Sequence, residues 1–297
     1  MAIDHILVPI DFSDPSRQAL KHAVLLAREV GAVLSLVHAW NPVGWAAIAE
    51  LGVDVARELE NPARDAARNS LDEWTDEVRR EGVVVESHLV RGQASNVIPE
   101  RARRERADLV IVGRRGHAGL AHVLLGSVSE RVVGLNPCPT LVVPEEAALV
   151  TRFPRILCGV DYSAAARDAV LGAVQLARRA GAPRVVNLVH VEPSRSELEN
   201  WSELIADDPS SEDPAALRDW ADRIQEDCVS LETRSIEGRV EAGLIEFARA
   251  EEFDWICVGA HGHSALAAFL LGSTTDRILK LADRPVLVVP ARRAESG

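Results

Sequence analysis

Lysine is almost absent from this sequence of 297 residues, in which it occurs only at Lys21 and Lys280. A Walker A phosphate loop needs a lysine between glycine and Ser or Thr, and neither lysine stands in that context. No G-x-G-x-x-G follows the first apolar run of either half, and no G-x-S-x-G occurs. These absences exclude the P-loop, the usual dinucleotide fingerprint and the hydrolase nucleophile elbow, and no general base for a reaction is evident.

Cysteines and long apolar runs are also scarce. The four cysteines (Cys138, Cys158, Cys228 and Cys257) lie far apart without a C-x-x-C pair, which argues against a disulfide framework and a zinc site. No run approaches 18 uninterrupted apolar residues, and the first residues, MAIDHILVPIDFSD, lack the pattern of a secretory signal. We therefore expect no membrane span and a cytoplasmic protein with buried thiols.

Basic residues are outnumbered by acidic ones, 33 against 45, which gives a formal charge of −12. This charge opposes binding to DNA or RNA through the general field of the protein. A protein that handles a small anion in a local pocket fits the composition better.

The most informative stretch that is present runs from Gly113 to Ser127 and reads GRRGHAGLAHVLLGS. A second copy, GAHGHSALAAFLLGS from Gly259 to Ser273, keeps the pattern G-x-x-G-x9-G-S, and each landmark recurs 146 residues later. Together with the chain length, the repeat predicts two related domains, residues 1–146 and 153–293.

Short apolar runs alternate with helical patterns in each half. In the first half we expect strands at 5–10, 33–39, 83–90, 107–112 and 139–143, and helices near 13–31, 63–80, 95–104 and 127–135. The second half repeats this order, and Trp220, 146 residues after Trp74, is expected to fill an equivalent packing position. The pattern predicts an α/β fold of two repeated open five-stranded parallel sheets, each in the order 3-2-1-4-5 with helices on both faces.

Two long segments do not fit this alternation. Residues 40–61 predict an irregular entrance with a helical middle part, and residues 192–213, rich in Ser, Glu and Asp, predict a solvated lid or a disordered loop.

Glycines at the end of a strand let a ligand approach the backbone, and the helix that follows points unpaired N–H groups toward it. An anion is the natural occupant of such a loop. Ser127 and Ser273 directly follow the last glycine, where they either cap helices with Glu130 and Asp276 or also contact phosphate.

Asp11 and Asp161 follow the two first strands. In the order 3-2-1-4-5, the crevice between strands one and four is the topological switch point, where open α/β sheets bind ligands. Each aspartate would reach a ribose hydroxyl or an adenine edge there, or would form an Asx turn with Ser13 or Ser163.

Several other residues have two interpretations. Arg114 and Arg115 between the first glycines either contact phosphate or are solvated, and His38 and His190 at the ends of the second strands either line the site or end a strand. Metal binding is disfavoured because the four loop histidines, His117, His122, His261 and His263, belong to two copies and lack companion ligands.

With the strand-one aspartate, the glycine–serine loop and the final P-x-L-V-V-P strand, both halves resemble universal stress protein domains, whose fold is Rossmann-like and of the adenine nucleotide alpha hydrolase type. The resemblance covers nearly the whole chain and implies the subgroup that binds ATP, with or without Mg²⁺. The implied nucleotide contacts are Pro9, Ile10, Asp11, Val37, His38, Gly113, Arg114, Gly116, Gly126 and Ser127, and in the second half Val160, Asp161, Val189, His190, Gly259, Gly262, Gly272 and Ser273. Gly159 departs from the pattern because it replaces the proline matched by Pro9.

The resemblance also implies pairing of the last strands, Thr140–Val143 with Val286–Val289, and leaves a homodimer of the tandem chain open. We expect an ATP-binding stress-response protein whose nucleotide state regulates an unidentified protein partner. Slow ATP hydrolysis or phosphotransfer is one alternative, and a nucleotide-free interaction scaffold is another.

Overall fold

The computed structural model describes residues 3–41, 53–116, 125–135, 137–180, 184–192, 214–224, 229–262 and 271–291. The chain divides into two compact units, Ile3–Thr151 and a second that begins at Arg152. Each unit is an α/β domain with five parallel strands.

In the first unit, five strands alternate with four helices over the described residues. The elements are β1 (His5–Pro9), α1 (Asp14–Val30), β2 (Val33–Trp40), α3 (Val53–Arg80), β3 (Val85–Arg91), α4 (Ala94–Glu105), β4 (Leu109–Gly113), α5 (Ser127–Leu135) and β5 (Thr140–Val143). The strands are parallel in the order β3-β2-β1-β4-β5, and Ile6 of β1 lies opposite Leu109 of β4. The predicted strand order is therefore confirmed.

The second unit repeats this architecture. Its elements are β6 (Ile156–Gly159), α6 (Ala164–Arg179), β7 (Arg184–Glu192), α8 (Pro214–Asp222), β8 (Val229–Glu237), α9 (Val240–Ala250), β9 (Trp255–Gly259), α10 (Ser273–Leu281) and β10 (Val286–Val289). The strands follow one another as β8-β7-β6-β9-β10, again all parallel.

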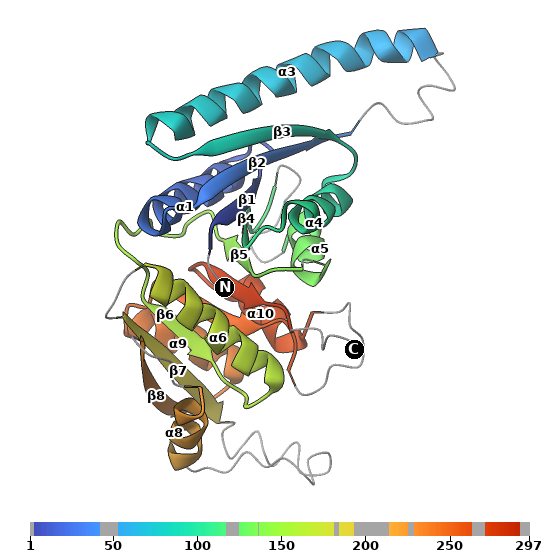
Figure 1. Cartoon of the computed structure of the whole chain (residues 1–297). Coiled ribbons are helices and arrows are strands. Elements are labelled where there is room, and N and C mark those ends of the chain that lie inside the picture. Colours follow the sequence, from blue (N-terminus) through green and yellow to red (C-terminus); the bar gives the residue numbers. More distant parts are fainter. Residues whose placement is uncertain are drawn as a thin grey trace, which may run out of the picture. The chain divides into compact units, whose positions relative to one another are not determined.

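Helices cover both faces of the first unit's sheet, with α1 and α3 on one face and α4 and α5 on the other (Figure 1). Right-handed crossovers produce this division, because the chain moves outward from β1 to β3 and then returns to β4 and β5. The strands between these layers are nearly continuous apolar runs, as a parallel sheet requires, and side chains such as Ile6, Leu7 and Ile111 are fully buried.

Helix α1 begins and ends where the sequence indicates. The Ser13 hydroxyl accepts a hydrogen bond from the Ser16 N–H at 3.3 Å, and a proline lies in the first turn. Gly31 ends the helix with a left-handed backbone, φ 72°. In the second unit, Ser163 caps α6 in the same way.

Helix α3 is longer than predicted, because it begins at Val53 rather than near residue 63 and contains Pro62. A proline removes one N–H from the helical ladder, and residues 61–66 are all exposed, so the turn that contains Pro62 lies at the protein surface. Residues 42–52 of the expected irregular segment, and 193–213 of the second one, lie outside the described residues.

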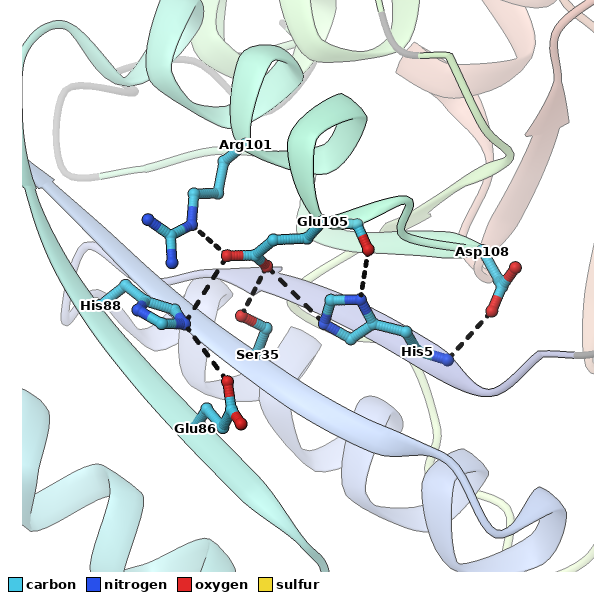
Figure 2. Close-up of polar contacts among 7 residues, drawn as sticks. All are labelled: His5, Ser35, Glu86, His88, Arg101, Glu105 and Asp108. Atoms are coloured by element: carbon cyan, nitrogen blue, oxygen red, sulfur yellow. Dashed lines mark hydrogen bonds and ion pairs between the residues drawn. The ribbon is translucent and has the colours of Figure 1, made fainter.

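At the amino ends of the first unit's strands, a polar cluster surrounds Glu105, in the last turn of α4 (Figure 2). Its carboxylate accepts hydrogen bonds from the Ser35 hydroxyl at 2.9 Å and from Arg101 Nε. The Nε2 atoms of His5 and His88 lie 3.7 and 3.6 Å from its oxygens. The cluster fixes the carboxyl end of α4 to β1, β2 and β3.

The described residues also bear on the sequence-based expectations about thiols, metals and membranes. Cys138, Cys158 and Cys257 are buried and unbridged, and Cys228 lies outside the described ranges. Where the chain is described, no group of three or more His, Cys, Asp or Glu side chains is placed to hold a metal ion. Likewise, no helix in the described ranges has the length and apolar character needed to cross a membrane.

Candidate functional site

The glycine loop of the first unit begins where β4 ends, and main-chain hydrogen bonds hold both of its ends. Arg114 N–H donates to the Val143 carbonyl at 2.8 Å, and Gly126 N–H donates back to the Arg114 carbonyl at 2.9 Å. In the second unit, Ala260 N–H donates to Val289 and Gly272 N–H donates to Ala260, both at 2.9 Å. The two loops therefore have the same anchored base.

Two glycines of each loop occupy positions where a side chain would not fit. A Cβ on Gly113 would lie 2.8 Å from the Pro15 carbonyl, and one on Gly259 would lie 2.8 Å from the carbonyl carbon of Ala165. A Cβ on Gly116 would overlap Asp11 Oδ2. The strand end thus packs directly on the first turn of α1 or α6, and the loop backbone approaches the strand-one aspartate.

Asp11 forms the Asx turn, which is one of the two roles that the sequence left open. Its Oδ1 accepts hydrogen bonds from the N–H and the hydroxyl of Ser13, which is the Asx turn. Its Oδ2 faces Gly116 across the switch point. In the second unit, Asp161 Oδ1 accepts from Ser163 N–H at 3.0 Å, and a Cβ on Gly262 would lie 2.7 Å from Asp161 Oδ2.

The expected N-cap role of the loop serines is wrong, because α5 and α10 begin at Ser127 and Ser273 themselves. The preceding glycine carbonyls accept the first helical bonds, from Glu130 N–H at 2.8 Å and Asp276 N–H at 2.9 Å, and Gly272 caps α10 without a side-chain bond. A backbone cap leaves the Ser127 hydroxyl available to the pocket described below.

Two buried hydroxyls that sequence reasoning missed tie these helices to the loop. Ser129 Oγ donates to the Gly113 carbonyl at 2.7 Å, and Thr275 Oγ1 donates to the Gly259 carbonyl at 2.8 Å. The two positions are 146 residues apart and share only a hydroxyl, which is the signal in the sequence that could have found them.

A pocket of about 420 Å³ opens at the carboxyl ends of β1 and β4 in the first unit. This volume lies within the range of small-molecule sites. The pocket is lined by Pro9, Ile10, Asp11, Ser16, Val37, Ala39, Ala94, Ile98, Val112, Gly113, Arg115, Gly116, Leu125, Gly126, Ser127 and Val128. One wall is apolar, whereas Asp11, Ser16, Arg115 and Ser127 supply the polar side chains.

Most predicted site residues of the first unit line this pocket, but His38 and Arg114 do not. Arg114 is buried, with Nη2 3.3 Å from Glu146 Oε2, and Arg115 lines the pocket instead. His38 lies between Val37 and Ala39, which line the pocket, so strand alternation turns its side chain to the opposite face.

In the second unit, the predicted residues occupy corresponding positions at the ends of β6, β7 and β9 and at the start of α10. The main difference is His261, which stands where the first loop has Arg115. At Gly159, the departure at the end of β6, a Cβ would lie 3.0 Å from Cδ2 of Leu244 in α9, so a larger residue there would require that side chain to shift. Of the four loop histidines, only His261 is among the described residues.

Comparison with known proteins identifies the family. The model of the universal stress protein family matches residues 2–144 and again residues 152–290. The chain belongs to the universal stress protein family. A universal stress protein of Mycolicibacterium smegmatis is 27% identical over 305 residues, covering 97% of each chain.

Two further relatives illustrate the single domain and the fold. A universal stress protein of Methanocaldococcus jannaschii is 32% identical over 143 residues, which cover 46% of this chain and 80% of that protein. The crystal structure of a universal stress protein from Archaeoglobus fulgidus matches with a TM-score of 0.75 at 19% identity, covering 98% of this chain and 100% of that one. This tandem universal stress protein therefore shares its fold with that structure over the full length.

Proposed function

We propose that this universal stress protein binds ATP at the switch point of each unit and that nucleotide occupancy regulates its contact with a protein partner. The observation that carries the proposal is the absence of a side chain at Gly116 and Gly262, where the loop backbone lies against an aspartate carboxylate. Such a cradle admits phosphates to backbone N–H groups without a Walker lysine.

The pocket of the first unit offers a partner for each part of the nucleotide. Its apolar wall, formed by Val37, Ala94 and Ile98, suits the adenine ring, and Asp11 suits a ribose hydroxyl. Ser127 and Arg115 lie with the glycine loop, where they would bind phosphate, and the first residues of α5 add N–H groups.

The energies are sufficient for such binding. Charge-assisted hydrogen bonds contribute about 1.5–3 kcal/mol each, and the start of a helix adds roughly 0.3–1 kcal/mol. Three such bonds and a buried ring reach about −8 kcal/mol, which corresponds to roughly micromolar affinity. The phosphates would also hold any Mg²⁺, with Asp11 as the carboxylate among the lining residues.

Regulation requires that nucleotide bind two conformations or two partner states unequally. The glycine loop joins β4 to α5, so phosphates bound there would restrain the chain between these two elements. We place the function in this restraint rather than in turnover.

Calorimetric titration of the full chain with ATP, ADP, AMP and cyclic AMP tests the proposal. Gly116→Asp should abolish binding at the first site and Gly262→Asp at the second, because each adds a carboxylate against Asp11 or Asp161. Gly82→Asp is the charge control, because Gly82 is exposed and has open space around its Cβ position, although its φ of 78° strains any side chain placed there. This control should bind ATP like the wild type.

Absence of binding below millimolar ATP in the wild type would refute the proposal and favour the interaction scaffold. Equal affinity in the wild type and in the double variant would refute the site. ATP turnover that disappears in the double variant would favour the hydrolase or phosphotransferase instead.

A further inference from the structure

A histidine of the second strand lies behind the turn that follows strand one in both units. His38 Nδ1 is 2.7 Å from the Ile10 carbonyl oxygen, and His190 Nδ1 is 2.7 Å from the Val160 carbonyl oxygen. A carbonyl oxygen only accepts hydrogen bonds, so Nδ1 carries the proton and donates it. Each histidine thus donates a hydrogen bond to the carbonyl of the residue directly before the strand-one aspartate.

The residue after that aspartate has an unfavourable backbone conformation in both units. Phe12 has φ 64° and Tyr162 has φ 61°, in the left-handed region that bulky side chains avoid. This conformation turns the chain between the aspartate and the serine that caps α1 or α6. Strained residues persist only where their surroundings hold them.

The same histidines hold these strained residues. The His38 ring lies 4.5 Å from the Phe12 ring, and Trp74 of α3 contacts Phe12 edge-on at 5.6 Å. In the second unit, Tyr162 lies 4.7 Å from His190 and 6.3 Å from Trp220. The equivalent packing predicted for Trp74 and Trp220 is confirmed, and both belong to one repeated device.

In the first unit, the cluster of His38, Phe12 and Trp74 lies outside the pocket. Ile10 and Asp11 line the pocket, whereas His38, Phe12 and Trp74 do not. A hydrogen bond and a ring on one face of the sheet therefore fix the backbone that presents a carboxylate on the other face.

We propose that His38 and His190 are positioning residues that hold Asp11 and Asp161 against the glycine loops by fixing the strained turn. This inference rests on the proposed ATP binding. It assigns to the histidines a role without ligand contact, and it makes the N–H at the Nδ1 position the essential feature.

The test uses matched amides in the full chain that carries Gly262→Asp, so that only the first site reports. In His38→Asn the amide nitrogen falls near the Nδ1 position, whereas in His38→Gln it falls near Nε2. Both variants lose the ring equally. Calorimetry with ATP should give an affinity within about 3-fold of the parent for His38→Asn and at least about 10-fold weaker for His38→Gln.

A second substitution tests the strained turn directly. Asparagine adopts the left-handed region more readily than phenylalanine, so Phe12→Asn added to His38→Gln should recover part of the lost affinity. A merely structural role predicts further loss instead, because this substitution removes another ring from the cluster. Circular dichroism checks that each variant is folded.

The outcomes separate the two proposals. If the parent does not bind ATP, the proposed function fails. If the parent binds and His38→Gln binds equally well, or His38→Asn is as weak as His38→Gln, the positioning role is overturned. The pair His190→Asn and His190→Gln, in a chain carrying Gly116→Asp, repeats the test on the second unit.

Discussion

His22 shows how a single buried side chain makes the first unit sensitive to acid. It lies in α1 with 3% of its surface exposed, hydrogen-bonded to the backbone of Ala147, and its Nε2 has no partner. Burial lowers the pKa of His22 to about 4, and the Ala147 hydrogen bond opposes this shift only partly. The folded unit therefore keeps this imidazole neutral at pH values where the unfolded chain binds a proton.

The sign of the pH dependence follows from this difference. An unfolded histidine titrates near 6.5, so the unfolded state binds more protons than the folded state between pH 6.5 and 4. The first unit should lose stability as the pH falls through this window, by about 3 kcal/mol in total. Urea unfolding at pH 7 and pH 4.5 measures the loss.

His22→Asn keeps a donor near the Ala147 carbonyl but does not titrate, so it should lose less stability than the wild type over the same interval. The second unit provides an internal control, because its unfolding should respond to pH equally in both proteins. Identical pH dependence of the first unit in the wild type and in His22→Asn would contradict the assignment.

Residue types alone pointed to the glycines and the aspartates of the candidate site, because few other residues meet those steric and polar demands. They did not separate Arg114 from Arg115. The hydrogen bond from Arg114 N–H to Val143 extends the β4 pairing by one residue, so strand alternation sends successive arginines to opposite faces. The sequence analysis also left two interpretations of His38 open, and the alternation of β2, with Val37 and Ala39 on the pocket face, favours the one outside the pocket.

At the scale of elements, the sequence predicted most strands and helices because apolar periodicity and capping residues agree. It placed the start of α3 too late, because the helix runs through Pro62, a residue type that usually ends or kinks a helix. The helix N-caps at Gly126 and Gly272 were missed because a backbone cap leaves no side-chain signature.

The packing of α1 on the end of β4 gives a prediction at this scale. A Cβ on Gly113 would meet the main chain of Pro15, which cannot rotate away, so Gly113→Ala must displace the first turn of α1. We expect a loss of about 1–3 kcal/mol in the free energy of unfolding. ATP affinity should fall as well, because Ser16 of that turn lines the pocket.

Gly126→Ala is the graded comparison, since its Cβ would lie 3.3 Å from the nearest atoms of Arg114 and Arg115. Chemical unfolding should rank Gly113→Ala as clearly more destabilising than Gly126→Ala. The same ranking should hold for Gly259→Ala and Gly272→Ala, where the corresponding distances are 2.8 and 3.4 Å. A reversed order in both units would mean that the close contact of Gly113 or Gly259 with the first turn of α1 or α6 does not determine the loss of stability.

At the scale of the whole molecule, each unit contains a complete five-stranded sheet and the full set of elements that build its site. The pocket of the first unit is lined only by residues between Pro9 and Val128, all within Ile3–Thr151. The His38, Phe12 and Trp74 device also lies wholly inside this unit.

Residues 1–151 produced alone should therefore fold and retain the first site. A domain of this size buries enough apolar surface to be stable by itself. The isolated unit should unfold cooperatively and bind ATP within about 3-fold of the affinity that the full chain shows when Gly262→Asp silences its second site. Calorimetry on both proteins measures this ratio, and Gly116→Asp in the isolated unit should abolish binding.

Sedimentation of the same isolated unit tests the pairing expected of the last strands. Within its own unit β5 is the terminal strand. This strand, Thr140–Val143, is short and mostly apolar, and both properties favour pairing with another strand. We expect the isolated unit to self-associate, so that its average mass rises toward that of a dimer as the protein concentration increases. A strictly monomeric unit that still binds ATP would refute pairing through this strand while leaving the nucleotide site intact.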